Sequence, residues 1–163
     1  MDFPTPFARY ETEVLPAWID GNNHMNMGYY VVLFDLATDE IWDALGIGRG
    51  YKQATQCGTF AAEAHIVYER EMLVGERGRV HSRVIGFDAK RLHVAHELYR
   101  ISDGVRAAAQ EFLFLHVDLA IRRVVPWPAD VLARLGVAAA AHATLPPPDW
   151  TGRRIALPSR APA

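Results

Sequence analysis

Residues 27–45 read MGYYVVLFDLATDEIWDAL and form the strongest helical signal in the chain. Apolar residues recur there at helical spacing: Met27, Tyr30, Val31, Phe34, Ile41 and Leu45. Acidic residues form a narrow line at four-residue intervals: Asp35, Asp39 and Asp43. A helix that is apolar over most of its circumference is normally buried inside a domain. Gly46 is suited to end it, so we expect one long buried helix on the order of 28 Å in length.

Strand character lies mainly downstream of this helix. Four segments carry it: Thr59–Tyr68, Arg77–Phe87, Arg91–Ile101 and Arg106–Leu119. Tight turns at Asp88-Ala89 and Asp103-Gly104 indicate hairpins, and therefore an antiparallel sheet. A helix followed by an antiparallel meander is an α+β plan. Its simplest solution buries the helix in the concave face of a curled sheet, which is the hotdog fold.

The remaining segments complete one domain. Phe7–Val14 reads as a first strand, whereas Leu15–Met25 and Gly46–Gly58 read as irregular loops. Pro128 begins a short helix with an alanine run behind it. We expect the domain to span residues 1–143, with an extended proline-rich tail over residues 144–163.

Bulk properties exclude several classes of protein. The 163 residues carry a net charge of −2, and this balance argues against a nucleic-acid binder, which usually shows a basic face or stripe. Cys57 is the only cysteine, so neither disulfides nor a thiolate metal cluster are expected. No secretion signal and no apolar run of about 20 residues is present, which predicts a cytoplasmic protein outside the membrane.

The residues directly before the long helix carry the chemistry. Residues 18–30 read WIDGNNHMNMGYY and place Asp20, His24 and Asn26 in the turn ahead of it. A helix amino terminus presents unpaired N–H groups and the positive end of the helix dipole, which suit a developing oxyanion. An aspartate beside it can attack a carbonyl or activate water. Asn26 is also a good helix cap on ordinary grounds.

This stretch resembles the Asp-x-x-Gly-His-x-Asn-x-x-x-Tyr signature of hotdog thioesterases of the 4-hydroxybenzoyl-CoA thioesterase type. Asp20, His24, Asn26 and Tyr30 stand in register with it. The resemblance implies that Asp20 is the nucleophile or general base and that the N–H of Met27 polarises the thioester carbonyl. Asparagine stands where the signature has glycine, and asparagine is the next most tolerated residue at positive φ.

A closer resemblance covers about Phe7 to Pro158. Further shared segments are similar to the betainyl-CoA thioesterases of carnitine breakdown: Phe34-Asp35, Ala37-Thr38-Asp39, Glu63-x-His65-Ile66, Lys90-Arg91-Leu92-His93, His116-Val117-Asp118 and Gly152-Arg153-Arg154-Ile155. The resemblance implies a small acyl-CoA substrate, with coenzyme A as part of the substrate and no other cofactor. It also implies a homodimer or homotetramer, because hotdog sites resemble clefts shared between subunits.

Betaine carries a permanent positive charge, so its pocket must offer countercharge or aromatic faces. Glu63 is an unusual residue among small and apolar neighbours, and we expect it to bind the substrate. Solvent is the commoner fate of a strand glutamate. Trp18, Tyr30 and Tyr68 are the expected aromatic contributors.

Several alternatives stay open at this point. The substrate is betainyl-CoA, another short-chain or aryl acyl-CoA, or an acyl carrier protein thioester, and a non-catalytic acyl-CoA-binding module has the same fold. His93 and His96 are three apart on a strand and therefore point to opposite faces, which argues against a histidine metal site. The basic residues open for the CoA phosphates are Lys90, Arg91, Arg122 and Arg123.

Overall fold

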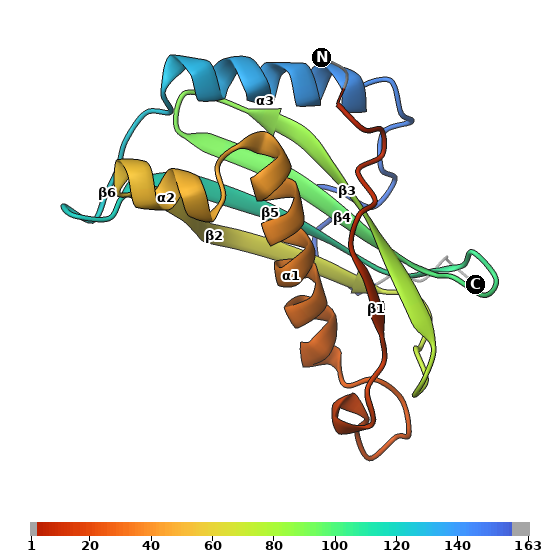
Figure 1. Ribbon diagram of the computed structural model, residues 1–163. Helices are drawn as coiled ribbons and strands as arrows, with labels where there is room; N and C mark the ends of the chain where they lie inside the picture. Colours follow the sequence, from red (N-terminus) through yellow and green to blue (C-terminus); the bar gives the residue numbers. More distant parts are fainter. Residues whose placement is uncertain (1–2, 158–163) are drawn as a thin grey trace.

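One curled antiparallel sheet forms the body of the molecule, and the computed structural model describes residues 3–157 (Figure 1). Its strands are β1 (Glu11–Glu13), β2 (Cys57–Tyr68), β3 (Arg77–Phe87), β4 (Arg91–Arg100), β5 (Arg106–Asp118) and β6 (Arg123–Val124). They follow the order β1-β3-β4-β5-β2, with β6 paired to β5. The helical elements are η1 (Pro16–Trp18), α1 (Met27–Leu45), α2 (Arg49–Thr55) and α3 (Ala129–His142). With α1 in the concave face of the sheet, the expected hotdog architecture is confirmed.

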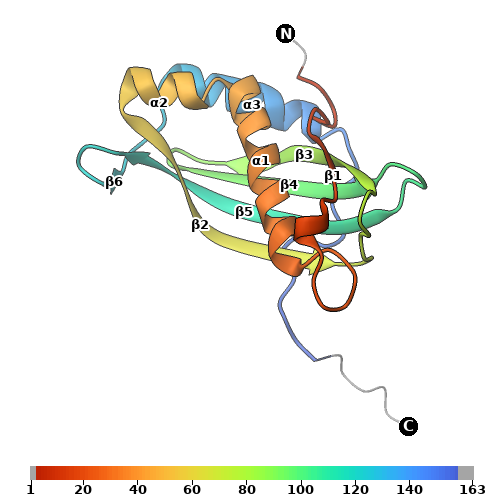
Figure 2. The ribbon, with the colours of Figure 1, turned by 60° about the horizontal axis from the view of Figure 1, so that its bottom comes forward.

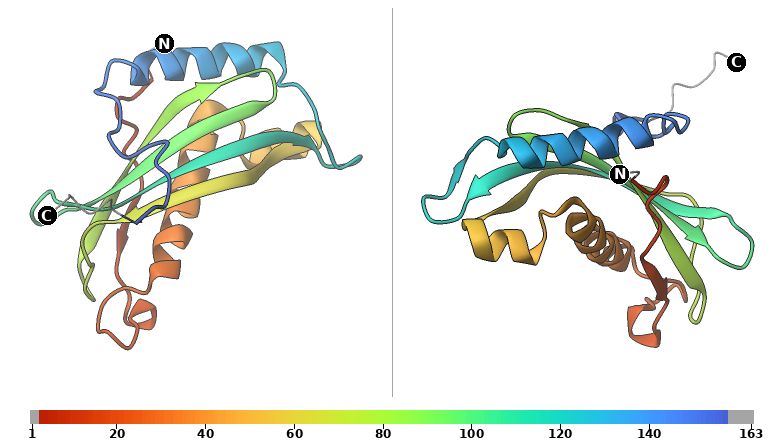
Figure 3. Two further views of the ribbon diagram at one scale, coloured as in Figure 1. Left: turned by 180° about the vertical axis from the view of Figure 1, so that it is seen from behind. Right: turned by 45° about the horizontal axis from the view of Figure 1, so that its top comes forward.

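Helix α1 crosses the concave face of the sheet, as the views in Figure 2 and the right half of Figure 3 show. Its bounds are those expected from the sequence, and Gly46 ends it in the left-handed conformation at φ 68°. Leu33, Phe34 and Ile41 are fully buried against the sheet. The expectation of burial around most of the helix is only half met, because one face stays exposed and apolar: Met27, Val31, Val32 and Leu36.

The two edges of the sheet differ. The outer edge of β3 is covered along one half by β1. Along the other half lies α3, whose His142 Nδ1 accepts a 2.9 Å hydrogen bond from the Val84 N–H. In the described part of the chain β2 pairs only with β5, so its other side is a free edge. Such an edge is a ready template for another strand.

Three sequence expectations need correction. The strand expected over Phe7–Val14 shrinks to β1, with Phe7 making an isolated bridge to Ser82. The loop expected over Gly46–Gly58 contains α2, which has an exposed surface and no apolar stripe to reveal it. The alanine run lies inside α3 and extends that helix to His142.

The segment after α3 crosses the convex face of the sheet (Figure 3, left). Trp150 is only 1% exposed and packs with Ala95 and Ala109 of β4 and β5. Its indole N–H donates to Glu97 Oε1 at 2.9 Å. Residues 158–163 of the expected tail, and residues 1–2, lie outside the described part. Within the described part no helix has the length and apolarity needed to cross a membrane.

Candidate active site

The loop before α1 is a tight turn built by its own backbone. The Asp20 N–H donates to the His24 carbonyl at 3.0 Å, and Ile19 and Met25 form an antiparallel bridge behind it. Asn23 takes a positive φ of 64°, as expected for a residue that stands in place of glycine. The Asp20 carboxylate accepts a 2.8 Å hydrogen bond from the Asn22 N–H. That bond fixes the carboxylate's direction while its second oxygen stays open.

The start of α1 offers one N–H to a ligand. The Asn26 side chain caps the helix by accepting from the Gly28 N–H at 2.9 Å, and the Tyr29 N–H donates to the Asn26 carbonyl. Within residues 3–157, no acceptor lies within hydrogen-bond distance of the Met27 N–H. Met27 is 67% exposed, so the helix starts at the surface of the protomer. An unpaired N–H at the positive end of a helix dipole is suited to an oxyanion.

His24 borders the same turn. Its Nδ1 lies 3.2 Å from the Met25 carbonyl, which is a contact that orients the ring beside the loop. A protonated Nδ1 in this contact leaves Nε2 as an acceptor. The ring can therefore hold the loop and still meet a substrate.

The three expected aromatic residues gather around the helix start. Trp18 stacks on Tyr29 at 5.3 Å. Tyr68 donates its hydroxyl to the Met27 carbonyl at 3.2 Å and packs edge-on against Tyr30 at 5.3 Å. Tyr30 is buried, and its hydroxyl accepts from the Met72 N–H. Burial raises the pKa of both tyrosines, so they remain neutral aromatic walls.

Glu63 lies elsewhere. It sits at the bulge in β2, opposite Leu113 of β5, and it is exposed. Tyr68, which bonds to the helix start, is five residues further along the strand, roughly 16 Å away at the ordinary strand rise. Within one protomer the fold therefore brings Trp18, Tyr30 and Tyr68 to the helix start but leaves Glu63 apart.

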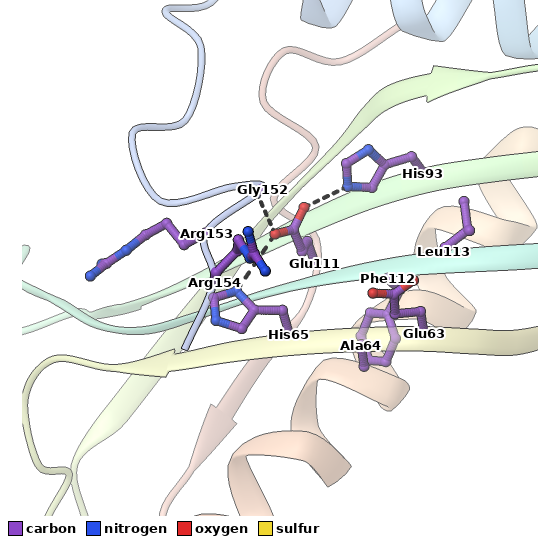
Figure 4. A pocket seen from close by; sticks show the side chains of 10 residues that line it. All are labelled: Glu63, Ala64, His65, His93, Glu111, Phe112, Leu113, Gly152, Arg153 and Arg154. Carbon is purple, nitrogen blue, oxygen red and sulfur yellow. Dashed lines mark hydrogen bonds and ion pairs between the residues drawn. The ribbon is translucent and has the colours of Figure 1, made fainter. Parts of the chain in front are cut away.

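Figure 4 shows Glu63 at the rim of a pocket of about 380 Å³ that the C-terminal segment borders. At its centre, Glu111 accepts from the Gly152 N–H at 2.7 Å and contacts His93 Nε2 at 2.8 Å. His65 Nδ1 lies 3.6 Å from the same carboxylate. This group of residues, which we call the Glu111 network, joins two histidines and the C-terminal segment through one buried acid.

His96 lies on the inner face of the sheet, so the expectation that His93 and His96 point to opposite faces is confirmed. Its ring nitrogens contact Thr38 Oγ1 at 3.0 Å and Ser82 Oγ at 2.8 Å. Burial lowers the pKa of His96 to about 3, and the ring is therefore neutral. Among the described residues, no group of three or more His, Cys, Asp or Glu is placed to hold a metal ion.

The residues considered for the CoA phosphates lie at one end of the sheet. Arg91 is held by Asp88 within the β3–β4 hairpin through a 2.7 Å hydrogen bond from its Nε. Arg122 and Arg123 lie at the β5–β6 turn, which adjoins this hairpin, because the His116 N–H just before the turn donates to the Lys90 carbonyl at 2.9 Å.

The sequence reasoning missed Glu111 and Trp150. Glu111 follows Gln110 in the otherwise apolar run of β5, and a polar pair inside such a run was the available signal. Trp150 was hidden by its proline-rich surroundings. The sequence alone does not show which residues Glu111 and Trp150 contact, because their partners lie on other elements of the fold.

Comparisons with known sequences point to one family. The model of the Thioesterase-like superfamily matches residues 14–135. The chain is 38% identical over 149 residues to a protein of Pseudomonas aeruginosa named betainyl-CoA thioesterase, covering 91% of this chain and 94% of that protein. It is 31% identical to a Rhizobium meliloti protein named L-carnitine dehydrogenase/betainyl-CoA thioesterase, covering 95% of this chain but only 31% of that protein.

Solved structures agree with the sequence relatives. A protein from Pseudomonas putida KT2440 described as a putative thioesterase superposes with a TM-score of 0.82 at 34% identity, covering 96% of this chain and 99% of that one. The Staphylococcus aureus protein SAV2348, solved in complex with CoA, superposes with a TM-score of 0.86, covering 97% and 100% of the two chains. Its identity of 23% bears on the fold alone.

Proposed function

The chain belongs to the thioesterase-like superfamily, and on that premise we propose that it is an acyl-CoA thioesterase whose substrate is betainyl-CoA. The observation that carries this proposal is the 38% identity to the Pseudomonas aeruginosa enzyme over 91% of the chain. The matched region includes the loop with Asp20 and the start of α1. The products are betaine and the free thiol of coenzyme A.

We assign the oxyanion to the Met27 N–H and the attack to Asp20. The thioester carbonyl oxygen points at the unpaired N–H, which stabilises the negative charge that develops on it. The Asp20 carboxylate then attacks the carbonyl carbon, giving an anhydride that water hydrolyses, or takes a proton from the water that attacks. In both routes the C–S bond breaks and the CoA sulfur leaves as thiolate. The backbone bond from Asn22 supports this assignment by directing the carboxylate.

The acyl head requires a carboxylate or aromatic faces. Trp18 and Tyr68 supply aromatic faces at the helix start, and Tyr68 is 45% exposed there. Glu63 lies in a stretch that resembles the betainyl-CoA thioesterases, and we retain it as a proposed substrate-binding carboxylate, to be tested by Glu63→Gln. Arg153 and Arg154 line the same pocket, so their positive charges compete with a cationic ligand for Glu63.

We further propose that the active unit is a homodimer formed along β2. The free edge of this strand and the exposed apolar face of α1 support it, because β2 runs beside α1, with Thr59 bonded to Trp42 and Tyr68 bonded to the Met27 carbonyl. A second copy pairing along β2 would continue the sheet and cover Phe60, which is 42% exposed. A tetramer would be built from two such dimers.

Hydrolysis rates across a panel of thioesters test the proposed function. The panel contains betainyl-CoA, acetyl-CoA, butyryl-CoA, benzoyl-CoA and a betainyl thioester of acyl carrier protein, with thiol release as the measurement. We expect the highest kcat/KM for betainyl-CoA. A preference for benzoyl-CoA or butyryl-CoA would show that betainyl-CoA is not the substrate. No turnover of any thioester would indicate a binding module without catalysis.

A further inference from the structure

A second cavity, of about 710 Å³, opens between α1, α2 and the first half of β2. Aromatic side chains from three elements line it: Trp42, Phe60 and Phe114. Trp42 donates its indole N–H to Thr59 Oγ1 at 2.8 Å and packs against Phe114 at 4.9 Å. These contacts hold the Trp42 ring in place as a wall of the cavity. None of these residues belongs to the helix-start loop.

One side of this cavity is acidic. Asp35, Asp39 and Asp43 line it, and in the described part of the chain none of them forms an ion pair. Like charges four residues apart on a helix destabilise it. Burial raises the pKa of Asp39, and the charges of Asp35 and Asp43 raise it further, whereas Arg49 opposes them. A ligand that brings positive charge would relieve this repulsion.

The opposite rim of the cavity is basic. Arg49 and Lys52 of α2 line it, and both also line a neighbouring open depression of about 450 Å³ with Gln53 and Gln56. The two hollows therefore form one groove with an acidic, aromatic end and a basic end. The acyl head of betainyl-CoA is cationic, so its charge is opposite to that of the acidic end.

We propose that the aromatic and acidic end of this groove binds the quaternary ammonium head of the substrate. Trp42, Phe60 and Phe114 offer ring faces, and Asp35 and Asp39 offer countercharge, which together are the chemistry that recognises such a cation. This inference rests on the proposed function and names the residues that select its acyl group.

The position of the cavity requires a second copy of the chain. Asp35 and Asp39 follow Met27 by eight and twelve residues, which is roughly 12–18 Å along the helix. A betainyl group is too short to bridge that span from the Met27 N–H of the same protomer. In a two-fold dimer each patch meets its counterpart. An antiparallel approach of two α1 helices, centred on exposed Val31 and Val32, brings the helix start of one copy beside Asp35 of the other.

Neutralising the acids tests the cavity against a matched substrate pair. The substrates are betainyl-CoA and 3,3-dimethylbutanoyl-CoA, in which carbon replaces the charged nitrogen at nearly equal shape. We expect Asp39→Asn and Asp35→Asn each to raise KM for betainyl-CoA by about tenfold, with little change for the neutral analogue. Trp42→Leu should show the same selectivity. Glu40→Gln is the control, since it removes a charge from the same helix outside the cavity.

Binding and stability measurements separate this role from a structural one. Binding of betainyl-CoA is measured on the Asp20→Asn protein. Adding Asp39→Asn to it should raise the dissociation constant by the same factor by which Asp39→Asn raises KM. The Asp39→Asn protein should unfold at the same or a higher temperature, because a repulsion has been removed.

Equal losses of hydrolysis for both substrates, or no loss for either, would overturn the cavity proposal. If only Glu63→Gln reduces the hydrolysis of betainyl-CoA selectively, Glu63 and not the cavity binds the cationic head. Wild-type hydrolysis of the neutral thioester only would overturn the proposed substrate instead.

Discussion

The helix-start loop and the Glu111 network are built in opposite ways. In the loop, Asp20 and His24 are held by backbone bonds within a few residues of themselves, and the Met27 N–H has no hydrogen-bond partner among residues 3–157. In the Glu111 network, side chains from β2, β4 and β5 meet the segment at Gly152 around a carboxyl that is mostly buried. The loop leaves the Met27 N–H without a partner in the described part of the chain. The network bonds the Glu111 carboxylate to two partners, although His65 Nδ1, 3.6 Å away, is left without a hydrogen bond.

This difference indicates a separate role for each region. Open carboxylates and unpaired N–H groups are costly to keep and are typical of sites that meet a ligand. Buried and mutually bonded polar groups fix the position of the elements that carry them. We therefore expect changes in the loop to reduce activity, and changes in the network to reduce stability.

Asp20→Asn should have the largest effect on activity. It keeps the acceptor for the Asn22 N–H but removes the charge that attacks or activates water. General-base catalysis is worth about 10²–10⁴ in rate, so kcat should fall by at least that order with the melting temperature unchanged. Steady-state hydrolysis together with thermal unfolding measures both. A rate within a few-fold of wild type would remove Asp20 from the mechanism.

Trp150→Ala should have the largest effect on stability. The side chain is fully buried on the convex face, and its N–H satisfies Glu97. Removing a buried tryptophan costs about 3–5 kcal/mol in the free energy of unfolding. Denaturant titration measures the loss, and kcat of the remaining folded protein should stay near the wild-type value. A large loss of kcat in folded protein would show that the convex face also serves the reaction.

Glu111→Gln should act on stability by a smaller amount. The amide keeps one acceptor for the Gly152 N–H but loses the charge that faces His93. Weakening a buried hydrogen bond to a charged group costs about 1–3 kcal/mol. Proteolysis after residue 145 should accelerate, since the C-terminal segment loses its anchor. Unchanged stability and unchanged cleavage would contradict the anchoring role.

Asn26→Ala should have the smallest effect and should touch both quantities. It removes the cap on Gly28, which costs about 0.5–2 kcal/mol in stability. A modest loss of rate should accompany it, because the first turn of α1 presents the Met27 N–H. Asn26→Ser keeps a capping oxygen and serves as the control. Equal stability of the alanine and serine variants would exclude a capping role for this side chain.

Local patterns in the sequence determined much of the fold. The helix over residues 27–45 and its end at Gly46 follow from apolar spacing and one glycine, and both are confirmed. The opposite orientation of His93 and His96 follows from the strand period alone. The turn with Asn23 at positive φ is also local, because contiguous residues build it. Such features depend on neighbours along the chain, and the sequence displays those neighbours directly.

The contacts between elements far apart in the chain follow only from the tertiary structure. It places Glu63 in a pocket with arginines and apart from the helix start, and it sets the acidic line of α1 against Trp42 and Phe114. It buries Trp150 and reveals α2, whose Tyr51 hydroxyl contacts His116 Nε2 at 2.8 Å. These arrangements join residues far apart in the chain. Strand order and curvature bring such residues together, and no periodicity in the sequence records that order.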